Sequence, residues 1–241
     1  MSRLSESIKS LEKMNEEETK LLEREGPESK LRGYLTVIAG VCIHLFNGNI
    51  YLWGNIGGYV ITYFHFGGDE VATKSIAVMM IPVGFTVQSC TAPFGAFLLK
   101  RYNPKIIIAV GSLVMCASIL IASFMKTWWS FLIFYGVLFP AGIGIVNWPP
   151  TICGWEWFPE NKGLVSGLII GGYGFGAFIF GFISTAIINP NNEQADKETG
   201  YYPESVGLKF PGALRIMLIM WACLSLLAVL LVSRNPEFTK K

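Results

Sequence analysis

Six uninterrupted apolar stretches, each long enough to cross a lipid bilayer, constrain this chain more than any other feature. They lie at about 34–59, 75–99, 104–125, 128–153, 163–188 and 211–233. A helix needs about 20 apolar residues to span the hydrocarbon core, and in a helix every interior backbone group is bonded within the segment itself. Composition agrees, since 52% of the 241 residues are hydrophobic and 15% are charged. We therefore predict an all-α membrane protein with six transmembrane helices.

The charged residues divide the chain into three parts. Residues 1–32 hold seven basic and eight acidic side chains, 33–234 hold the six spans, and 235–241 form a short tail. Leu4, Ile8, Leu11 and Met14 recur at helical spacing in the first part, until Gly26-Pro27 ends the pattern. We expect an amphipathic or disordered arm there, either solvated or docked on a partner or membrane surface. It lacks the apolar core of a secretory signal.

Lys and Arg predict the orientation of the spans. Eleven lie before the first span, in the second and fourth connections, or after the last span: Lys20, Arg24, Lys30, Arg32, Lys100, Arg101, Lys105, Lys162, Arg234, Lys240 and Lys241. The other side has four: Lys74, Lys126, Lys197 and Lys209. By the positive-inside rule, both ends of this multi-pass protein are expected on the cytoplasmic, or matrix, side. The sequence does not indicate which membrane.

The fifth stretch, GLVSGLIIGGYGFGAFIFG, carries seven glycines over residues 163–181. At 100° per residue, five of them gather on or beside a stripe about 80° wide. They are Gly163, Gly167, Gly171, Gly174 and Gly181. Small residues at this spacing let helices in lipid approach closely, so we predict a helix-packing seam. Gly172 and Gly176 lie on the other side, which indicates packing on two faces or local pliability.

Polar side chains also follow one face of the first stretch. His44, Asn47, Tyr51 and Asn55 stand at i, i+3, i+7 and i+11. Facing lipid would be costly for them, so we expect a cavity or another helix beside them, although packing between helices would satisfy any single residue. With three polar residues from other spans, they predict a polar path through the bundle. The three are Gln88, Asn147 and Tyr173.

Catalytic and metal-binding patterns are missing from the sequence. The five cysteines lie in or beside spans without ligand spacing, and the two histidines share no motif with a nucleophile or carboxylate. GGYGFG at 171–176 follows no strand, so we do not interpret it as a dinucleotide site. Arg215 is the basic residue inside a span, near its outer end, where an interfacial anchor is expected. We expect no enzyme activity, cofactor, metal or nucleic-acid partner.

Three segments resemble one branch of the major facilitator superfamily, the oxalate/formate antiporters and monocarboxylate transporters. WEWFPENKGLVSGLIIGGYGFGAFIF at 155–180 resembles the segment that joins helices 4 and 5 there. GNIYLWG at 48–54 resembles its first-helix signature, and AFLLKRYNPK at 96–105 lies where the loop between helices 2 and 3 belongs. The resemblance spans about 33–234. It implies the amino-terminal six-helix half of that fold, built from two inverted three-helix repeats.

The resemblance also implies a function. We expect a half-size transporter of small organic anions, such as monocarboxylates or dicarboxylates, working by alternating access with a second half or a homodimer partner. Lys100, Arg101 and Lys105 would form its conformational-switch loop, although Lys100 stands where the family has an acid. The alternative is a transport-inactive subunit that serves as a scaffold in a larger membrane complex. Whether the chain is naturally half-size or truncated stays open, as do substrate, coupling ion and oligomeric state.

Overall fold

The computed structural model describes residues 27–239, and helices make up its regular structure. Six helices in this part are long and apolar enough to cross a membrane, which confirms the predicted number. Most of the predicted arm, 1–26, and the last two residues lie outside the described residues. The elements are α2 (Pro27–Asn47), η1 (Gly48–Ile50), α3 (Trp53–Phe66), α4 (Lys74–Ala77), α5 (Met80–Leu98), α6 (Pro104–Ala122), α7 (Trp128–Phe131), η2 (Leu132–Leu138), α8 (Phe139–Trp157), η3 (Pro159–Asn161), α9 (Lys162–Ile188), α10 (Glu204–Gly207), α11 (Phe210–Leu231) and α12 (Pro236–Thr239).

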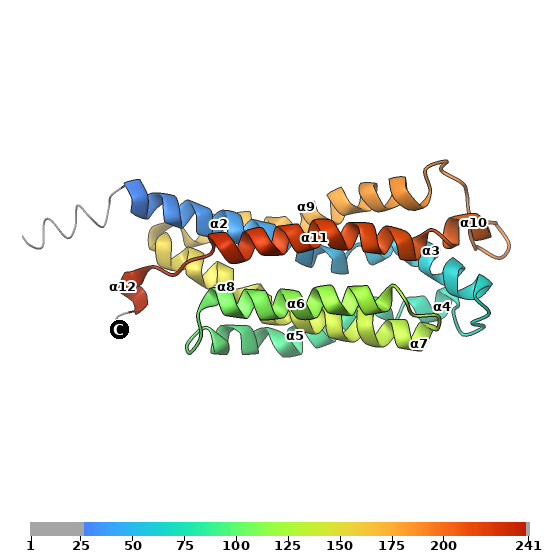
Figure 1. Ribbon diagram of the computed structural model, residues 1–241, viewed down its shortest axis with the longest axis horizontal. Coiled ribbons are helices and arrows are strands. Elements are labelled where there is room, and N and C mark those ends of the chain that lie inside the picture. The colour runs from blue at the N-terminus through green and yellow to red at the C-terminus, as the bar shows by residue number, and fades with distance from the viewer. Residues whose placement is uncertain (1–26, 240–241) are drawn as a thin grey trace, which may run out of the picture.

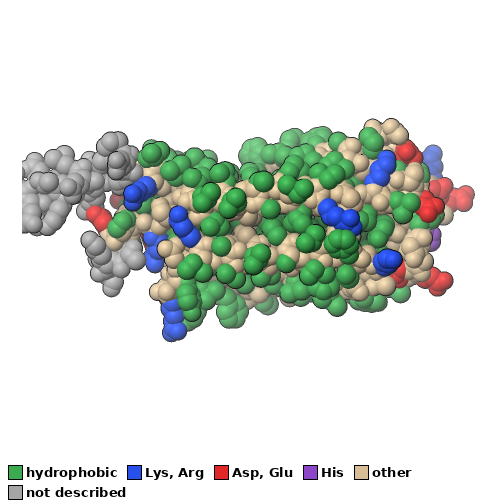
Figure 2. Space-filling view, viewed as in Figure 1, with side chains coloured by type: hydrophobic (Ala, Val, Ile, Leu, Met, Phe, Trp, Pro, Cys, Tyr) green, Lys and Arg blue, Asp and Glu red, His purple; other side chains and the backbone are tan. Residues whose placement is uncertain are grey.

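The long helices run side by side in one elongated bundle (Figure 1). The described chain begins and ends at the same end of this bundle, which we call the termini end. Helix α8 packs against α5 and α6, while α2 packs against α8, α9 and α11. Large hydrophobic side chains remain exposed along the flanks, and charged side chains gather toward the two ends (Figure 2). This distribution suits a protein whose middle contacts hydrocarbon.

The first span is a broken helix, unlike the single stretch predicted at 34–59. Helix α2 ends at Asn47, the 3₁₀ turn η1 follows, and α3 continues to Phe66. The amides of Tyr51 and Leu52 donate to the carbonyls of Gly48 and Asn49, at 3.0 and 3.1 Å. The break therefore leaves these backbone groups bonded, as the interior of a membrane requires.

A second irregularity lies in the fourth span. Residues 132–138 form the π-helical segment η2, and Pro140 follows it in the first turn of α8. Proline has no N–H to donate to the carbonyl four residues earlier, so a regular α-helix cannot continue unchanged through this position. The wider i→i+5 turn accommodates this loss and shifts the register of the helix that follows. Pro149 and Pro150 are tolerated further along the same helix.

Helices α2 and α9 meet through glycine. A Cβ added at Gly172 would lie 2.9 Å from the Cβ of His44, and one at Gly176 would overlap the carbonyl oxygen of Leu45. These two backbones therefore approach more closely than any other residue type allows. The glycines on the far side of α9 differ, because a Cβ at Gly163, Gly167, Gly171 or Gly174 would meet nothing within 4 Å in the described chain. That face is open.

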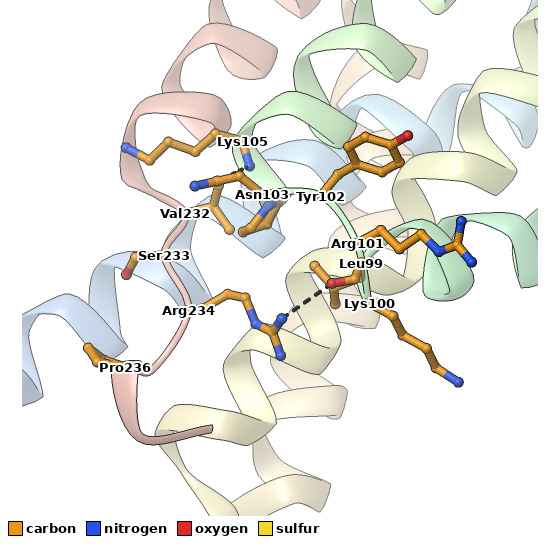
Figure 3. A pocket seen from close by; sticks show the side chains of 11 residues that line it. Leu99, Lys100, Arg101, Tyr102, Asn103, Lys105, Val232, Ser233, Arg234 and Pro236 are labelled. Carbon is orange, nitrogen blue, oxygen red and sulfur yellow. Dashed lines mark hydrogen bonds between the residues drawn. The ribbon is translucent and has the colours of Figure 1, made fainter. Parts of the chain in front are cut away.

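The chain segment after α11 is fixed at the termini end by an ion pair. The Nε of Arg234 lies 3.1 Å from both carboxylate oxygens of Glu156, whose residue is 7% exposed. Another guanidinium nitrogen donates to the Leu99 carbonyl at 3.2 Å, as Figure 3 shows. Hydrogen bonding to Glu156 raises the pKa of Arg234 above its usual range. Arg234 thus joins the ends of α5, α8 and α11.

The close contact between α2 and α9 predicts a difference between neighbouring glycines. Gly176→Val should destabilise the protein by about 1–3 kcal/mol, because its methyl groups have no room beside Leu45. Gly174→Val, two residues away on the open face, should change stability by less than about 0.5 kcal/mol. Unfolding by sodium dodecyl sulfate in mixed micelles, followed by tryptophan fluorescence, would measure both. Equal effects would show that this contact is not what fixes α9.

The ion pair makes a separate prediction. Glu156→Ala should destabilise the protein, because it leaves the Arg234 guanidinium without its carboxylate. We expect less than the ~3–5 kcal/mol typical of fully buried pairs, since the Arg234 side chain keeps 25% exposure. The exposed Glu160 provides a matched control, and its alanine variant should unfold at the wild-type detergent concentration. An unchanged Glu156→Ala midpoint would contradict the proposed role of this pair.

Candidate functional site

Part of the predicted polar path lines a single cavity. The cavity has a volume of about 240 Å³ and lies among α2, α5, α8 and α9. It is lined by His44, Tyr51, Gln88, Asn147, Trp148, Thr151, Ile170 and Tyr173. Five of the seven residues singled out from the sequence are therefore brought together. At ~30 Å³ per water molecule, this space suits a small organic molecule.

A chain of hydrogen bonds runs along the cavity wall. His44 Nδ1 lies 2.9 Å from the carbonyl oxygen of Gly40, and His44 Nε2 lies 3.2 Å from Oδ1 of Asn147. The Tyr173 hydroxyl donates to the same Asn147 oxygen at 3.0 Å. Gln88 Nε2 in turn donates to the Tyr173 hydroxyl at 3.1 Å. Four spans thus contribute to one polar network.

Aromatic rings enclose this network. The Tyr173 ring meets the His44 imidazole edge to face, with centroids 5.0 Å apart. Tyr51 also meets Tyr173 edge to face, at 6.1 Å, and packs against Phe85 at 5.4 Å. Tyr51 remains 51% exposed, whereas His44 is fully buried. The imidazole therefore lies at the inner wall of the cavity, and Tyr51 lies toward its opening.

Asn47 and Asn55 are the two predicted path residues that do not line the cavity. Asn47 is fully buried, and neither amide atom makes a hydrogen bond of ordinary geometry with the described residues. Asn55 lies against Gly181 on α9. The 3₁₀ turn η1 explains why Asn55 does not face the cavity. Each residue of a 3₁₀ turn advances about 20° further around the helix axis than an α-helical residue does. Three such residues rotate α3 by about 60° relative to α2.

Three lining residues were missed in the sequence analysis. Thr151 is one helical turn beyond Asn147 on α8, so its i, i+4 spacing could have placed it on the same face. Trp148 and Ile170 are apolar residues in apolar spans, and no sequence signal separates them from their neighbours. The lining contains no Asp, Glu, Lys or Arg. A ligand there meets hydroxyl, amide and imidazole groups.

The predicted switch loop lies apart from this cavity, at the termini end. It borders a larger hollow of about 660 Å³ between the α5–α6 connection and the segment after α11 (Figure 3). Lys105 Nζ donates to the Leu230 carbonyl at 2.9 Å, and the Arg101 guanidinium lies 5.5 Å from the Phe97 ring centroid. The Lys100 side chain points away from Arg234. Lys105 therefore engages a carbonyl, and Arg101 a ring, at the termini end.

Other candidate residues contribute to packing. Arg215 donates to Ser123 at the end of α6, 3.1 Å from its hydroxyl, and its guanidinium lies 4.2 Å from the Phe124 ring centroid. Cys42 and Cys153 are buried as free thiols. Among residues 27–239, no cluster of three or more His, Cys, Asp or Glu could hold a metal ion.

Comparison with known proteins agrees with the helical architecture. Residues 36–241 match the family model of the Major Facilitator Superfamily. The apicoplast pyruvate carrier 1 of Toxoplasma gondii is 26% identical over 192 residues, which cover 66% of this chain and 35% of the carrier. An MFS-type transporter from Aspergillus fumigatus is 24% identical over 212 residues, which cover 83% of this chain and 43% of the fungal protein.

A third relative is the probable transporter MCH2 of Saccharomyces cerevisiae. It is 28% identical over 139 residues, covering 55% of this chain and 28% of the yeast protein. The chain thus spans less than half the length of the curated relatives it matches. These relatives are membrane transporters, which agrees with the absence of catalytic motifs in the sequence. By its family match and its six apolar helices, the chain belongs to the major facilitator superfamily.

Proposed function

We propose that this chain forms one half of a transporter for small organic anions such as monocarboxylates. The observation that carries the proposal is the cavity, where His44, Asn147, Tyr173 and Gln88 from four spans form one hydrogen-bonded wall. Donors on this wall suit a carboxylate, and the volume of about 240 Å³ suits a compact one. The apicoplast carrier, whose name specifies pyruvate, suggests pyruvate as the first substrate to test.

The second part of the proposal concerns the missing half of the pathway. Family members alternate between inward- and outward-open states by rocking one six-helix half against another. The open face of α9 lies beside the cavity. Gly171 and Gly174 on that face directly follow Ile170 and Tyr173, which line the cavity. A second six-helix unit, either another polypeptide or a second copy, would close against this side.

The transport proposal predicts flux that depends on the cavity. The purified chain in liposomes, alone or with the partner that copurifies with it, should exchange labelled pyruvate against internal pyruvate. Tyr51→Ala should abolish this exchange, and Tyr173→Phe should reduce it about tenfold or more by breaking the network at a partly buried hydroxyl. Tyr34→Phe offers a matched control, because the Tyr34 ring packs on Phe158 away from the cavity. It should keep wild-type flux.

The scaffold alternative gives the opposite pattern. A transport-inactive subunit would be recovered in mild detergent as a stoichiometric complex that Tyr51→Ala leaves intact, with no pyruvate flux in any variant. Mass photometry of the purified material would distinguish a complex or dimer from a free monomer. Absence of flux with the copurified partner present would end the transport proposal for pyruvate, and recovery as a monomer would argue strongly against the scaffold.

A further inference from the structure

The hollow at the termini end is lined by cations. It has a volume of about 660 Å³ and lies between the α5–α6 connection and the segment after α11 (Figure 3). This volume falls within the ~300–1,000 Å³ that is typical of small-molecule sites. Its charged lining residues are Lys100, Arg101, Lys105 and Arg234, and no Asp or Glu of the described chain lines it. Four positive side chains therefore border one space.

Three of these cations have no counter-ion in the described chain. Arg234 is paired with Glu156, so its charge is balanced. Lys100, Arg101 and Lys105 are exposed, and no described Asp or Glu lies within ion-pair distance of them. In Figure 3 their side chains diverge from the loop, with Lys105 on one side and Lys100 and Arg101 on the other. Uncompensated positive charge thus borders the hollow from two sides.

The hollow lies at the level where the spans end. Helix α5 ends at Leu98, α6 begins at Pro104 and α11 ends at Leu231, and the lining residues lie at or directly beyond these positions. The lining also includes Tyr102, whose side chain is exposed. Tyrosine is enriched where membrane proteins meet the lipid headgroups. The position of the hollow along the bundle therefore matches the headgroup layer.

Helices α6 and α11 continue from the hollow as an apolar flank. They pack against each other, and Lys105 Nζ donates to the Leu230 carbonyl across this contact at 2.9 Å. Both helices expose apolar side chains toward the middle of the bundle: Ile106, Val110, Leu113 and Leu226. Figure 2 shows hydrophobic side chains along this flank and Lys or Arg side chains at its termini end. A positive end joined to an apolar flank suits a ligand with an anionic head and acyl chains.

We propose that this hollow binds the phosphate of an anionic phospholipid, whose acyl chains lie along α6 and α11. The exposed side chains of Lys100, Arg101 and Lys105 have room to turn onto a phosphate placed between them. The Arg101 guanidinium can donate two parallel hydrogen bonds to it, and each ammonium acts as a point charge. A phosphatidylcholine headgroup suits the site less well, because its positive choline group is repelled by the same cations.

The predicted orientation of the chain agrees with this ligand. The positive-inside rule places the termini end on the cytoplasmic side, and the cytoplasmic leaflet carries anionic lipids. Basic pockets between transmembrane helices on that side are a recurrent kind of binding site for anionic headgroups. The hollow is separate from the cavity among α2, α5, α8 and α9. The inference therefore does not depend on the transport proposal.

Native mass spectrometry of the full chain, released from mild detergent with the partner that copurifies with it, tests this site. The protein would be titrated with phosphatidylglycerol and, separately, with phosphatidylcholine of the same acyl chains. We expect phosphatidylglycerol to bind about tenfold or more tightly, because each Lys or Arg near an anionic headgroup contributes about fivefold. Raising ammonium acetate to ~0.5 M should remove most of this difference, since salt screens exposed charges. Equal binding of the two lipids would overturn the inference.

Charge-neutralising variants test the assignment of the residues. Lys100→Gln/Arg101→Gln should weaken phosphatidylglycerol binding by about twentyfold and leave phosphatidylcholine binding unchanged. The matched control is Lys126→Gln/Lys209→Gln, which removes the same charge from exposed side chains at the opposite end of the bundle. The control should bind phosphatidylglycerol as the wild type does. Equal weakening in the two double variants would show that net charge, and not this hollow, attracts the lipid.

A second measurement leaves the chain unaltered. Phosphatidylglycerol with a photoreactive diazirine on one acyl chain should label peptides from 97–113 and 226–236, and unlabelled phosphatidylglycerol should compete. Adducts spread evenly over the six spans would contradict the site. Glycerophosphoglycerol, which is the same headgroup without acyl chains, should not compete at equal concentration. Competition by this compound would make the hollow a site for a soluble phosphate ester and would overturn the assignment to a lipid.

Discussion

The need to bond the polar backbone away from water determines much of this structure. Six apolar stretches become helices because a helix satisfies its own backbone in hydrocarbon. Two places where the regular helical pattern fails are then resolved locally. The 3₁₀ turn at Gly48–Ile50 closes its own amides, and the π-helical turns at Leu132–Leu138 precede the proline that cannot donate. The buried imidazole of His44 is hydrogen-bonded to Gly40 on its own helix and to Asn147 on α8, and Asn147 in turn binds Tyr173.

The length of the apolar stretches and the polar residues within them could be identified from the sequence. The six spans follow from stretch length, and five cavity residues follow from the cost of placing polar groups in lipid. Asn55 shows where this reasoning fails, because periodicity assumes a uniform helix and a 3₁₀ turn rotates all that follows. The pairing of Glu156 with Arg234 joins residues 78 positions apart. No local pattern encodes such a contact.

The glycines of α9 give a further lesson about sequence patterns. The stripe at every fourth residue predicts a packing seam, and in the described chain most of that stripe meets no neighbour. The contact within the chain uses Gly172 and Gly176, on the face that the stripe left out. Both patterns satisfy the same rule of close helix approach. The sequence cannot distinguish a face that packs inside the chain from one that remains open.

The open face of α9 also limits how it can recognise anything. Its floor is backbone at Gly163, Gly167, Gly171 and Gly174, and its borders include exposed Leu164, Leu168 and Phe175. These glycines and their apolar neighbours offer no charge and no side-chain donor. It can discriminate between neighbours, whether a helix or a lipid acyl chain, by outline alone. A substitution that adds one methyl group to a glycine on this face would therefore change the outline that a neighbour meets, without any change of charge.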